Sequence, residues 1–487
     1  MGGYTGKILR INLTNGKISF EPLDMILAKK YLSGRGLAGK MYAEEVSSDT
    51  DALSPENKLF IATGVLTGTN APTSDRFMIV TKSPLNGRVT SSNFGGYWGS
   101  QLKFASYDMV ILEGKAEYPV YITIRDDLVE IKNAIHVWGK DVFTATDTLK
   151  EEFNDALVKV LTIGPAGEKL SAMAVVMNDL YRAAGCSGVG AVMGSKNVKA
   201  IMVRGTGEVK TINVREMERV LSEALSQVRK SNVKTQAKAT NLLPHREACQ
   251  RCPISCGRFS KGIGGKSTDS DYKCGGDFDS DLGICDRVAV QEANDLCNKL
   301  GLDKNSVNAT IAAGIELVQR GYIKAEELDG TPLEFGNIQG TLEWIRKIAY
   351  SVGLGAKMAK GFHHFVESYG ALGQSMHVKK RKLYDSQGSQ RQGQDLAAVI
   401  DAVGLCLFTS FALGLSDYTA IVNAVIGCKY TDEEILACGE RILNNERLLN
   451  LQASYIVAEN KLPNRLPNDL SLDNPSKGQT PKTVQMM

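Results

Sequence analysis

Hydrophobic and polar residues alternate in several short segments of the first two hundred positions. The clearest of these segments are residues 8–13, 17–21, 120–125 and 129–135. Each pair of segments flanks a short turn, Asn15-Gly16 in the first pair and Asp126-Asp127 in the second, as in β-hairpins. Alternation with period two is typical of strands that bury one face. The pattern therefore predicts a β-rich region over residues 1–209.

After Lys210 the apolar residues recur every three to four positions, which is the period of an amphipathic helix. Such helices are expected at residues 215–229, 287–300, 306–320, 341–352 and 356–369, and an apolar helix is expected at 396–415. Most of them precede a glycine, which commonly ends a helix. Polar stretches at 230–240 and 385–395 are predicted to be loops. We therefore predict an α+β fold with domains at 1–209, 210–395 and 396–487.

Glycine is concentrated in the loops between the predicted strands. The glycine-rich segments are residues 33–36, 64–69, 92–96, 164–167 and 183–188. Glycine lets the backbone approach a bulky ligand closely or adopt a positive φ. Single segments of this kind are often ordinary tight turns. Five of them together indicate a surface that holds something large.

The overall composition excludes several classes of protein. With 43% hydrophobic residues, 23% charged residues and a net charge of +3, the chain resembles neither a disordered protein nor a strongly basic nucleic-acid-binding protein. No run of eighteen apolar residues and no secretory signal occur, so we expect no membrane span. The expected location is the cytoplasm. In a reducing compartment, the ten cysteines favour a metal site over disulfides.

Three cysteines lie close together in the sequence, at Cys249, Cys252 and Cys256. Thiols at this spacing can reach one metal centre, but a fourth ligand must come from elsewhere in the chain. The candidates for this fourth ligand are Cys274, Cys285, Cys297 and Cys406. Structural zinc sites commonly use two Cys-x-x-Cys pairs, and only one such pair is present. The pattern therefore favours a [4Fe–4S] cluster over zinc.

A six-residue pattern occurs twice in the helical half and makes Cys406 a good candidate. It reads Asn-Lys-Leu-Gly-Leu-Asp over residues 298–303 and Asp-Ala-Val-Gly-Leu-Cys over residues 401–406. Two related loops with carboxylate or amide side chains suit a ligand with two similar halves, although such short patterns also arise by chance. No other internal repeat stands out in the sequence.

Several longer segments resemble the aldehyde ferredoxin oxidoreductase family. They are residues 91–116, 163–168 and 182–197. The cysteine trio and the two six-residue motifs resemble the same family, and the similar segments follow in order over most of the chain. The resemblance implies an N-terminal β-sheet base domain that is covered by two mainly α-helical domains.

The resemblance also implies three bound groups. A mononuclear tungsten, or molybdenum, would be held by two pterin cofactors without a protein ligand to the metal. A [4Fe–4S] cluster would bind Cys249, Cys252, Cys256 and Cys406, and Mg²⁺ would bind backbone oxygens of Asn93 and Ala183 and bridge the pterin phosphates. Arg76 matches an arginine between pterin and cluster. The other residues expected to bind cofactor are Gly95, Gly96, Arg182, Gly185, Asn298, Gly301, Leu302, Asp303, Asp401, Gly404 and Leu405.

The sequence departs from the family pattern in three places. Asn298 replaces an aspartate but keeps a hydrogen-bond acceptor. Asp271 stands near the position of acidic residues that reach the metal, so it is the candidate general base, with a solvated loop aspartate as the alternative. No histidine follows His377, whereas the family carries one before the second motif. His136, His363 and His364 are expected to have ordinary packed or surface roles.

The spacing of the family motifs indicates that the chain is short near residues 230–240 and 385–395. Either the protein is a shortened member of the family, or the sequence joins pieces across missing segments. We favour the second explanation because residues 386–392 contain no element that could replace a lost one. An intact mass of 52.8 kDa for the purified chain would contradict it.

The resemblance implies the oxidation of an aldehyde to a carboxylic acid, with the metal as Lewis acid and two-electron acceptor. Electrons would then pass one at a time through the cluster to ferredoxin or an iron–sulfur partner subunit. Two alternatives stay open: reduction of an aromatic acyl-CoA thioester, and a non-catalytic electron-transfer or scaffold role. The resemblance also implies that the protein forms a homodimer or a larger complex.

Overall fold

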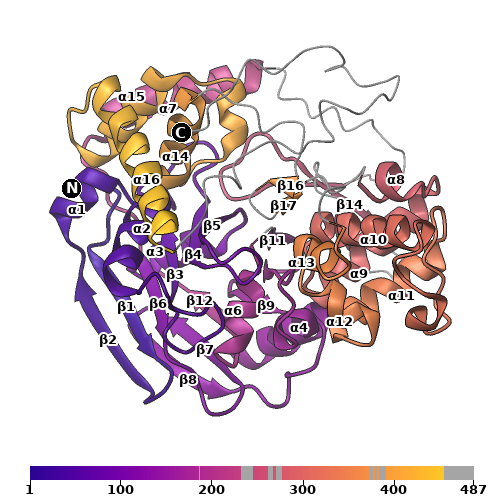
Figure 1. Ribbon diagram of the computed structural model, residues 1–487. Helices are drawn as coiled ribbons and strands as arrows, with labels where there is room; N and C mark the ends of the chain where they lie inside the picture. The colour runs from indigo at the N-terminus through magenta and orange to yellow at the C-terminus, as the bar shows by residue number, and fades with distance from the viewer. Residues whose placement is uncertain are drawn as a thin grey trace.

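Two β-sheets form the base of the molecule, and two groups of helices cover it (Figure 1). The structure is a computed structural model, and the residues that it describes are 1–185, 187–231, 245–261, 267–269, 277–371, 377–378, 381–382 and 391–453. The predicted α+β fold, with a β-sheet base domain followed by mainly helical regions, is confirmed.

The first sheet has the strand order β2-β1-β6-β3-β4-β5. Its strands are β1 (Lys7–Asn12), β2 (Lys17–Pro22), β3 (Leu59–Thr63), β4 (Phe77–Lys82), β5 (Val89–Phe94) and β6 (Met109–Glu113). β1 and β2 form the predicted hairpin, in which Ile11 stands opposite Ile18. β1 runs parallel to β6, and all other neighbouring strands are antiparallel.

The second sheet repeats this arrangement strand by strand, in the order β8-β7-β12-β9-β10-β11. Its strands are β7 (Val120–Arg125), β8 (Leu128–Asn133), β9 (Lys159–Ile163), β10 (Val176–Asn178), β11 (Arg182–Ala184) and β12 (Val198–Arg204). β7 and β12 are the parallel pair, and the other neighbours are antiparallel. The base is therefore a duplicated unit, a repeat that the sequence does not show.

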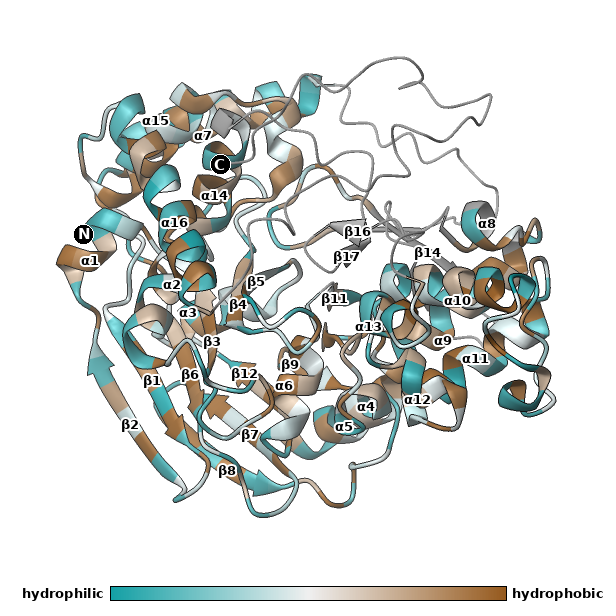
Figure 2. Cartoon of the chain, in the orientation of Figure 1, coloured by the Kyte–Doolittle hydropathy of each residue, from teal (hydrophilic) through white to brown (hydrophobic). Residues whose placement is uncertain are grey.

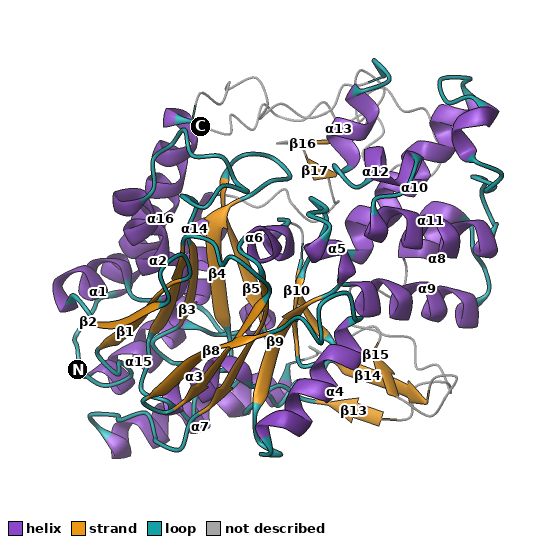
Figure 3. Ribbon diagram, turned by 90° about the horizontal axis from the view of Figure 1, so that it is seen from below, coloured by secondary structure: helices purple, strands orange, loops and turns teal. Residues whose placement is uncertain are grey.

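The two sheets share a core between them, and both sheets can be seen together in Figure 3. Along β3, Ile61 points into the shared core, whereas Phe60 points toward the helices. Along β12, Ile201 points into the shared core and Met202 points away. Because both faces of these strands are buried, they read as continuous apolar runs without alternation. They form the brown interior in Figure 2.

The first helical group packs on the outer face of the first sheet. It contains α1 (Met25–Tyr31), α2 (Gly34–Glu45), α7 (Val214–Lys230), α14 (Arg391–Val403), α15 (Leu415–Ile426) and α16 (Asp432–Gln452). The helices α2, α14 and α16 meet at glycines. A Cβ atom on Gly439 of α16 would fall 2.1 Å from the carbonyl oxygen of Asp395 in α14. A Cβ atom on Gly36 of α2 would fall 2.7 Å from Ile442 of α16, so the three helices are packed closely together.

The second helical group reaches the base through Ala166, Met173 and Ala191. It contains α8 (Asp277–Leu282), α9 (Arg287–Leu300), α10 (Lys304–Gln319), the 3₁₀ helix η1 (Ala325–Leu328), α11 (Ile338–Tyr350), α12 (Leu354–Met358) and α13 (Phe362–Glu367).

The other elements are α3 (Trp98–Phe104), α4 (Val142–Phe153), α5 (Pro165–Glu168), α6 (Val189–Ser195), β13 (His245–Glu247), β14 (Gly257–Lys261), β15 (Ser267–Asp269), β16 (His377–Val378) and β17 (Arg381–Lys382).

Two of the predicted helices are wrong in extent because glycines interrupt them. The helix predicted at 356–369 consists of α12 and α13, which are separated by Gly361. The helix predicted at 396–415 ends at Val403, where Gly404 has a φ of +85°. It is followed by the 3₁₀ helix η4 (Leu407–Phe411) and by α15.

Three predicted loops begin helices instead. Residues 33–36 contain the start of α2, residues 164–167 contain the start of α5, and residues 391–395 belong to α14. The division into 1–209, 210–395 and 396–487 stays a prediction. α14 runs across position 395, and α7 packs with α15 in the first helical group. No helix among the described residues is long and apolar enough to cross a membrane.

Replacing Lys103 by methionine is expected to destabilise the base by about 3–5 kcal/mol. Lys103 and Asp108 form an ion pair that is entirely buried, with side-chain exposures of 0% and 1%. Asp108 also accepts hydrogen bonds from the backbone nitrogens of Thr5 and Gly6, at 3.0 and 2.7 Å. Without the lysine, a carboxylate would remain buried without its cation.

Thermal and denaturant unfolding measure this loss of stability. The double variant Lys103→Met/Asp108→Leu removes both charges, so it should lose less stability than the sum of the two single variants. Additive losses would show that the pair is not coupled.

Candidate cofactor site

The two six-residue motifs pack against equivalent loops of the duplicated base. A Cβ atom on Gly64, directly after β3, would fall 2.2 Å from the backbone nitrogen of Gly404. A Cβ atom on Gly164, directly after β9, would fall 2.3 Å from the carbonyl oxygen of Leu300. Both motif glycines have positive φ, +85° at Gly404 and +73° at Gly301. The repeated motif is therefore matched by a repeat of the base beneath it.

Thr73 joins the cysteine trio to the second motif. Its backbone nitrogen donates to the carbonyl oxygen of Arg251 at 3.0 Å. Its hydroxyl accepts from the backbone nitrogen of Cys406 at 3.2 Å. One residue of the base thus holds Cys406 next to the loop that carries Cys249 and Cys252.

Cys249, Cys252, Cys256 and Cys406, here called the thiol site, are grouped around Arg76. Its Nη2 atom is 3.0 Å from the sulfur of Cys406, and its Nη1 atom donates to Oδ1 of Asn93 at 3.1 Å. Burial acts to lower the pKa of Arg76, but the nearby Cys406, Asp75 and Cys249 raise it well above its ordinary value. The guanidinium therefore stays charged and faces the thiols.

Asp75 is a buried carboxylate beside Arg76. Its Oδ2 atom accepts from the backbone nitrogen of Gly96 at 2.8 Å, and its Oδ1 atom has no hydrogen-bond partner among the described residues. Burial raises its pKa, although Arg76 acts in the opposite direction. A Cβ atom on Gly95 would fall 2.8 Å from the sulfur of Cys249. Only glycine leaves room for the thiol at this position.

Asp401 belongs to a chain of polar contacts between three elements. It accepts from Nδ2 of Asn93 at 2.7 Å and from Nη1 of Arg35 at 3.0 Å. Arg35 also forms two hydrogen bonds with Glu446 of α16, at 2.7 and 2.8 Å. The contacts therefore run from Glu446 through Arg35, Asp401 and Asn93 to Arg76 and the sulfur of Cys406.

The other half of the site lies along β11. Ser92 of β5 donates to the carbonyl oxygen of Gly185 at 3.5 Å, so β5 and β11 are neighbours. A Cβ atom on Gly185 would fall 3.1 Å from Oδ1 of Asp303, the residue that caps α10. Nη1 of Arg182 lies 4.0 Å from the sulfur of Cys256. The fold thus brings Gly185 and Asp303 together, and their role in binding cofactor stays a prediction.

Near this half, two buried amide atoms have no hydrogen-bond partner within the described ranges of the chain. They are Oδ1 of Asn178, at the end of β10, and Nδ2 of Asn298, in the first motif. The Nδ2 atom of Asn178 donates to the carbonyl oxygen of Gly95 at 2.6 Å. An unpaired buried amide is costly, so such atoms commonly mark a site where a further group binds.

The structure distinguishes among the described candidates for the fourth cysteine. Cys406 is 6% exposed and lies beside Arg76, which also lies near Cys249 and Cys256. Cys297 is buried in the core of the second helical group, and Cys285 is exposed. Cys274 lies outside the described residues. Among the described residues, no three His, Cys, Asp or Glu side chains gather closely enough to hold one metal ion.

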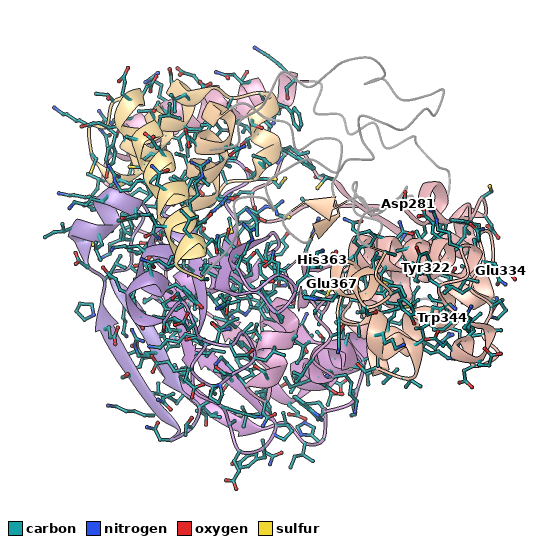
Figure 4. The ribbon with its side chains drawn as sticks, viewed as in Figure 1. Asp281, Tyr322, Glu334, Trp344, His363 and Glu367 are labelled. Atoms are coloured by element: carbon teal, nitrogen blue, oxygen red, sulfur yellow. The ribbon has the colours of Figure 1, made fainter. Side chains whose placement is uncertain are left out.

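Other predicted positions are not brought to the thiols. Gly301 and Leu302 pair with the base, where the carbonyl oxygen of Gly301 accepts from the backbone nitrogen of Val175 at 2.9 Å. Asp271, the candidate general base, lies outside the described residues. His363 lies on α13 and faces Glu367 of the same helix at 4.0 Å (Figure 4). His364, the next residue of α13, lies 3.5 Å from Glu367. These contacts fit the ordinary roles expected for the two histidines.

Four residues of the site were not predicted from the sequence: Arg35, Thr73, Asp75 and Asn178. A signal was available for two of them. Asp75 directly precedes Arg76, and Asn178 ends an apolar run that begins at Ala172. Arg35 and Thr73 gave no such signal, because their partners at Asp401 and Cys406 lie more than 300 positions away in the sequence.

Comparison with known proteins identifies the family. Residues 8–205 match the N-terminal domain of aldehyde ferredoxin oxidoreductase, and residues 173–393 and 389–487 match domains 2 and 3 of the same family. The tungsten-containing aldehyde ferredoxin oxidoreductase of Pyrococcus furiosus is 38% identical over an alignment that covers 100% of this chain and 95% of that protein. The enzyme of the same name from Thermococcus kodakarensis is 37% identical, with the same coverage.

A solved structure shares the fold. It is described as the active site complex BamBC of benzoyl coenzyme A reductase with 1,5-dienoyl-CoA. It has a TM-score of 0.87 and 21% identity, covering 95% of this chain and 91% of that one. The fold and the relatives define the class of this protein, which is an oxidoreductase. The chain belongs to the aldehyde ferredoxin oxidoreductase family.

The comparisons also bear on the predicted gaps. The first alignment spans 576 positions, whereas this chain has 487 residues, so at least 89 positions (576 less 487) of the relative have no counterpart. The two matches to domains 2 and 3 meet at residues 389–393, within the polar stretch where a missing segment was predicted. The chain is therefore shorter than its relatives. That the sequence joins pieces across missing segments stays a prediction.

Replacing Arg35 by glutamine is expected to destabilise the protein by roughly 2 kcal/mol, because it leaves Asp401 and Glu446 without their shared cation. These side chains are 19% and 17% exposed. Burial already raises the pKa of Asp401, and Arg35 lowers it. In the variant this pKa rises further, so the folded state binds the proton more tightly than the unfolded state. The deficit in stability should therefore grow as pH increases above the ordinary range of an aspartate.

Denaturant unfolding at several pH values measures this effect. Arg10→Gln is the matched control, because Arg10 is 15% exposed and binds Glu21, Glu45 and Glu113 away from the thiols. Both variants should lose stability, but only Arg35→Gln should change the rate at which Cys406 reacts with a thiol reagent. Equal thiol reactivity in the two variants would mean that the contacts from Arg35 do not reach the site.

Proposed function

We propose that this protein oxidises aldehydes to carboxylic acids with a tungsten bis-pterin cofactor and passes the electrons through a [4Fe–4S] cluster to ferredoxin or an iron–sulfur partner. The proposal extends to this chain what the names of its relatives say of those proteins. One observation carries it above the others: Arg76 touches the sulfur of Cys406 and lies near two thiols of the trio.

The residues of the thiol site fit an iron–sulfur cluster. Within the part of the chain that the structure describes, none of Cys249, Cys252, Cys256 and Cys406 forms a disulfide bond. Burial raises the pKa of Cys249 well above its ordinary value and raises that of Cys252 to about 11. Thiols held neutral in this way need a strongly positive group before they ionise, and iron supplies it. We assign these four cysteines as the cluster ligands, with Arg76 and Arg182 balancing their charge.

The polar groups around Arg76 fit a large anionic cofactor. Buried atoms of Asp75, Asn178 and Asn298 have no partner in the described part of the chain, and they can hydrogen-bond to the amino and ring N–H groups of pterins or to their carbonyl oxygens. Arg76 and Arg182 can offset phosphate charge, and the neighbouring strands β5 and β11 carry the backbone oxygens of Asn93 and Ala183 proposed to bind Mg²⁺. When bound, tungsten would supply Lewis acidity and accept two electrons.

The two motifs are proposed to hold the two halves of the cofactor. Asp401 would accept hydrogen bonds from one pterin, beside Gly404 and Leu405. Asn298, Leu302 and Asp303 would bind the other, beside Gly95, Gly96, Gly185 and Gly301. Asp303 is 8% exposed and Asn298 is 2% exposed, so both side chains are largely shielded from water before any cofactor binds. Asp271 stays the proposed general base. We also propose a cytoplasmic location and a homodimer or larger complex.

Metal analysis and two assays test the proposed function. Protein from cells supplied with tungstate and molybdate should contain about four iron atoms per chain together with tungsten or molybdenum. Aldehydes should reduce a low-potential dye, and aromatic acyl-CoA thioesters should not be reduced by it. Iron without tungsten or molybdenum would favour the scaffold role. Activity with the thioesters alone would favour the reductase, and zinc in place of iron would overturn the proposal.

A further inference from the structure

An exposed apolar segment directly follows Cys406. In η4, Phe411 is 72% exposed and Leu407 is 45% exposed. Phe408 lies beside Phe411, with 6.2 Å between the ring centroids. These three side chains form an apolar patch, here called the η4 patch, one to five residues from a thiol that we assign to the cluster.

The η4 patch is fixed in place and is not a loose loop. Thr409, in its middle, is fully buried. Its hydroxyl lies 2.8 Å from the hydroxyl of Tyr418 and 2.7 Å from the carbonyl oxygen of Cys406. Because Thr409 anchors the segment from within, Leu407 and Phe411 are held facing solvent. Exposed apolar groups that are held rigidly are typical of interaction surfaces.

A second exposed residue next to the thiols adjoins the patch. Arg251 is exposed and precedes Cys252. Thr73 binds the backbone of both Arg251 and Cys406, so the two loops reach the surface side by side. The η4 patch and Arg251 therefore stand next to assigned thiols on two loops that meet at Thr73.

Further basic residues stand at the edge of the patch. The α7 side chain of Gln227 donates to Asp417 at 3.1 Å, which places the end of α7 beside the residues that follow η4. Arg229 and Lys230, in the last turn of α7, are exposed. Lys230 is three positions from Gln227 and shares its face of the helix. Asp417 itself adds one carboxylate at this edge. Arg229, Lys230 and Arg251 outnumber it, so the residues named here give the rim of the apolar patch a net positive charge.

We propose that the η4 patch docks the electron acceptor, a small iron–sulfur carrier protein with an acidic surface. An apolar centre with a charged rim fits such a transient partner, because opposite charges steer the encounter and fix its orientation. Oxidation of one aldehyde with one water to the acid releases two electrons and two protons. Each electron reduces one oxidised carrier centre, so two carriers are used per turnover. The inference rests on the proposed function.

The variants Phe411→Glu and Arg229→Glu/Lys230→Glu test the patch, and Leu128→Glu is the control. Leu128 is 58% exposed but lies in β8, at the opposite end of the molecule from α7 (Figure 1). The probe is a purified low-potential [4Fe–4S] ferredoxin. With an aldehyde as substrate, Phe411→Glu should raise the KM for ferredoxin about tenfold or more. Its dye-linked rate should stay that of the unmodified protein.

The dependence of the ferredoxin KM on ionic strength distinguishes the role of the basic residues from that of the apolar residues. Arg229→Glu/Lys230→Glu should raise the KM for ferredoxin at low salt and weaken its dependence on ionic strength. Leu128→Glu should change neither quantity. An unchanged ferredoxin KM in Phe411→Glu, with normal dye-linked activity, would overturn the docking site and leave the proposed function intact.

Direct binding keeps the two proposals distinguishable. If the unmodified protein shows no dye-linked aldehyde oxidation, the proposed function fails, and calorimetric titration with ferredoxin then decides the docking site alone. Binding that is lost in Phe411→Glu supports it, and binding that is kept in this variant overturns it. The alternative partner for the η4 patch is a second copy of this chain, and analytical sedimentation tests it. A dimer that becomes a monomer in Phe411→Glu would assign the patch to this dimer contact and overturn the docking site.

Discussion

Replacing Cys406 by alanine is expected to remove most of the iron from the purified protein, which should otherwise contain about four atoms per chain. The trio would remain, but three thiols leave one corner of a cluster without a protein ligand. Nη2 of Arg76, now 3.0 Å from the sulfur, would lose this partner too. Iron analysis and the visible absorption of the cluster measure the outcome. Activity with dye and with ferredoxin should fall together.

Cys438→Ala is the matched control for this variant. Cys438 is 3% exposed, compared with 6% for Cys406, and it packs in the core of the first helical group. Its removal should cost some stability and leave the iron content unchanged. Full iron in Cys406→Ala would contradict the assignment, and the fourth ligand would then have to be sought among Cys274, Cys285 and Cys297.

Replacing Gly404 by alanine is expected to destabilise the protein by about 3 kcal/mol or more. Gly404 has a φ of +85°, which residues other than glycine rarely adopt. Its new Cβ would also fall 2.4 Å from Oγ1 of Thr67 and 3.0 Å from the carbonyl oxygen of Arg76. Since both neighbours belong to the tightly packed base, the motif must move, and Cys406 moves with it. The temperature of thermal unfolding and the iron content should therefore both fall.

Gly321→Ala separates the cost of the backbone from the cost of the clash. Gly321 has a φ of +76°, similar to that of Gly404, but nothing lies within 4 Å of a Cβ at this position. It should lose only about 1 kcal/mol and keep its iron. Equal losses in the two variants would mean that the close packing of Gly404 on the base contributes nothing.

The thiol site shows how far sequence reasoning reaches. The spacing of Cys249, Cys252 and Cys256 indicates a shared centre because ligands within one short loop need no knowledge of the fold. The fourth ligand lies 150 positions further on, so spacing left four candidates. The second motif favoured Cys406, and its contacts with Thr73 and Arg76 agree with that choice. Asp271, as general base, stays a prediction.

The helices show the same limit. α9 was predicted with its observed bounds, because its apolar face and its terminal glycine are local signals. Gly361 and Gly404 were not predicted to interrupt helices, since their positive φ follows from contacts with distant residues. Gly361 packs against Leu85, and Gly404 packs against Gly64 and Thr67. A periodic apolar pattern cannot report such contacts.

The sequence by itself determined the α+β class, the hairpins at both outer edges of the base, most helices, the cysteine trio and the repeated motif. Each hairpin, each helix, the trio and each copy of the motif is recognised from residues that are close together in the sequence. Only the tertiary structure revealed that the base is duplicated and that each motif packs on an equivalent loop of its own half. It alone joined Glu446, Arg35, Asp401 and Asn93 to Arg76. Contacts between distant segments depend on how the sheets pack, and no local pattern encodes that packing.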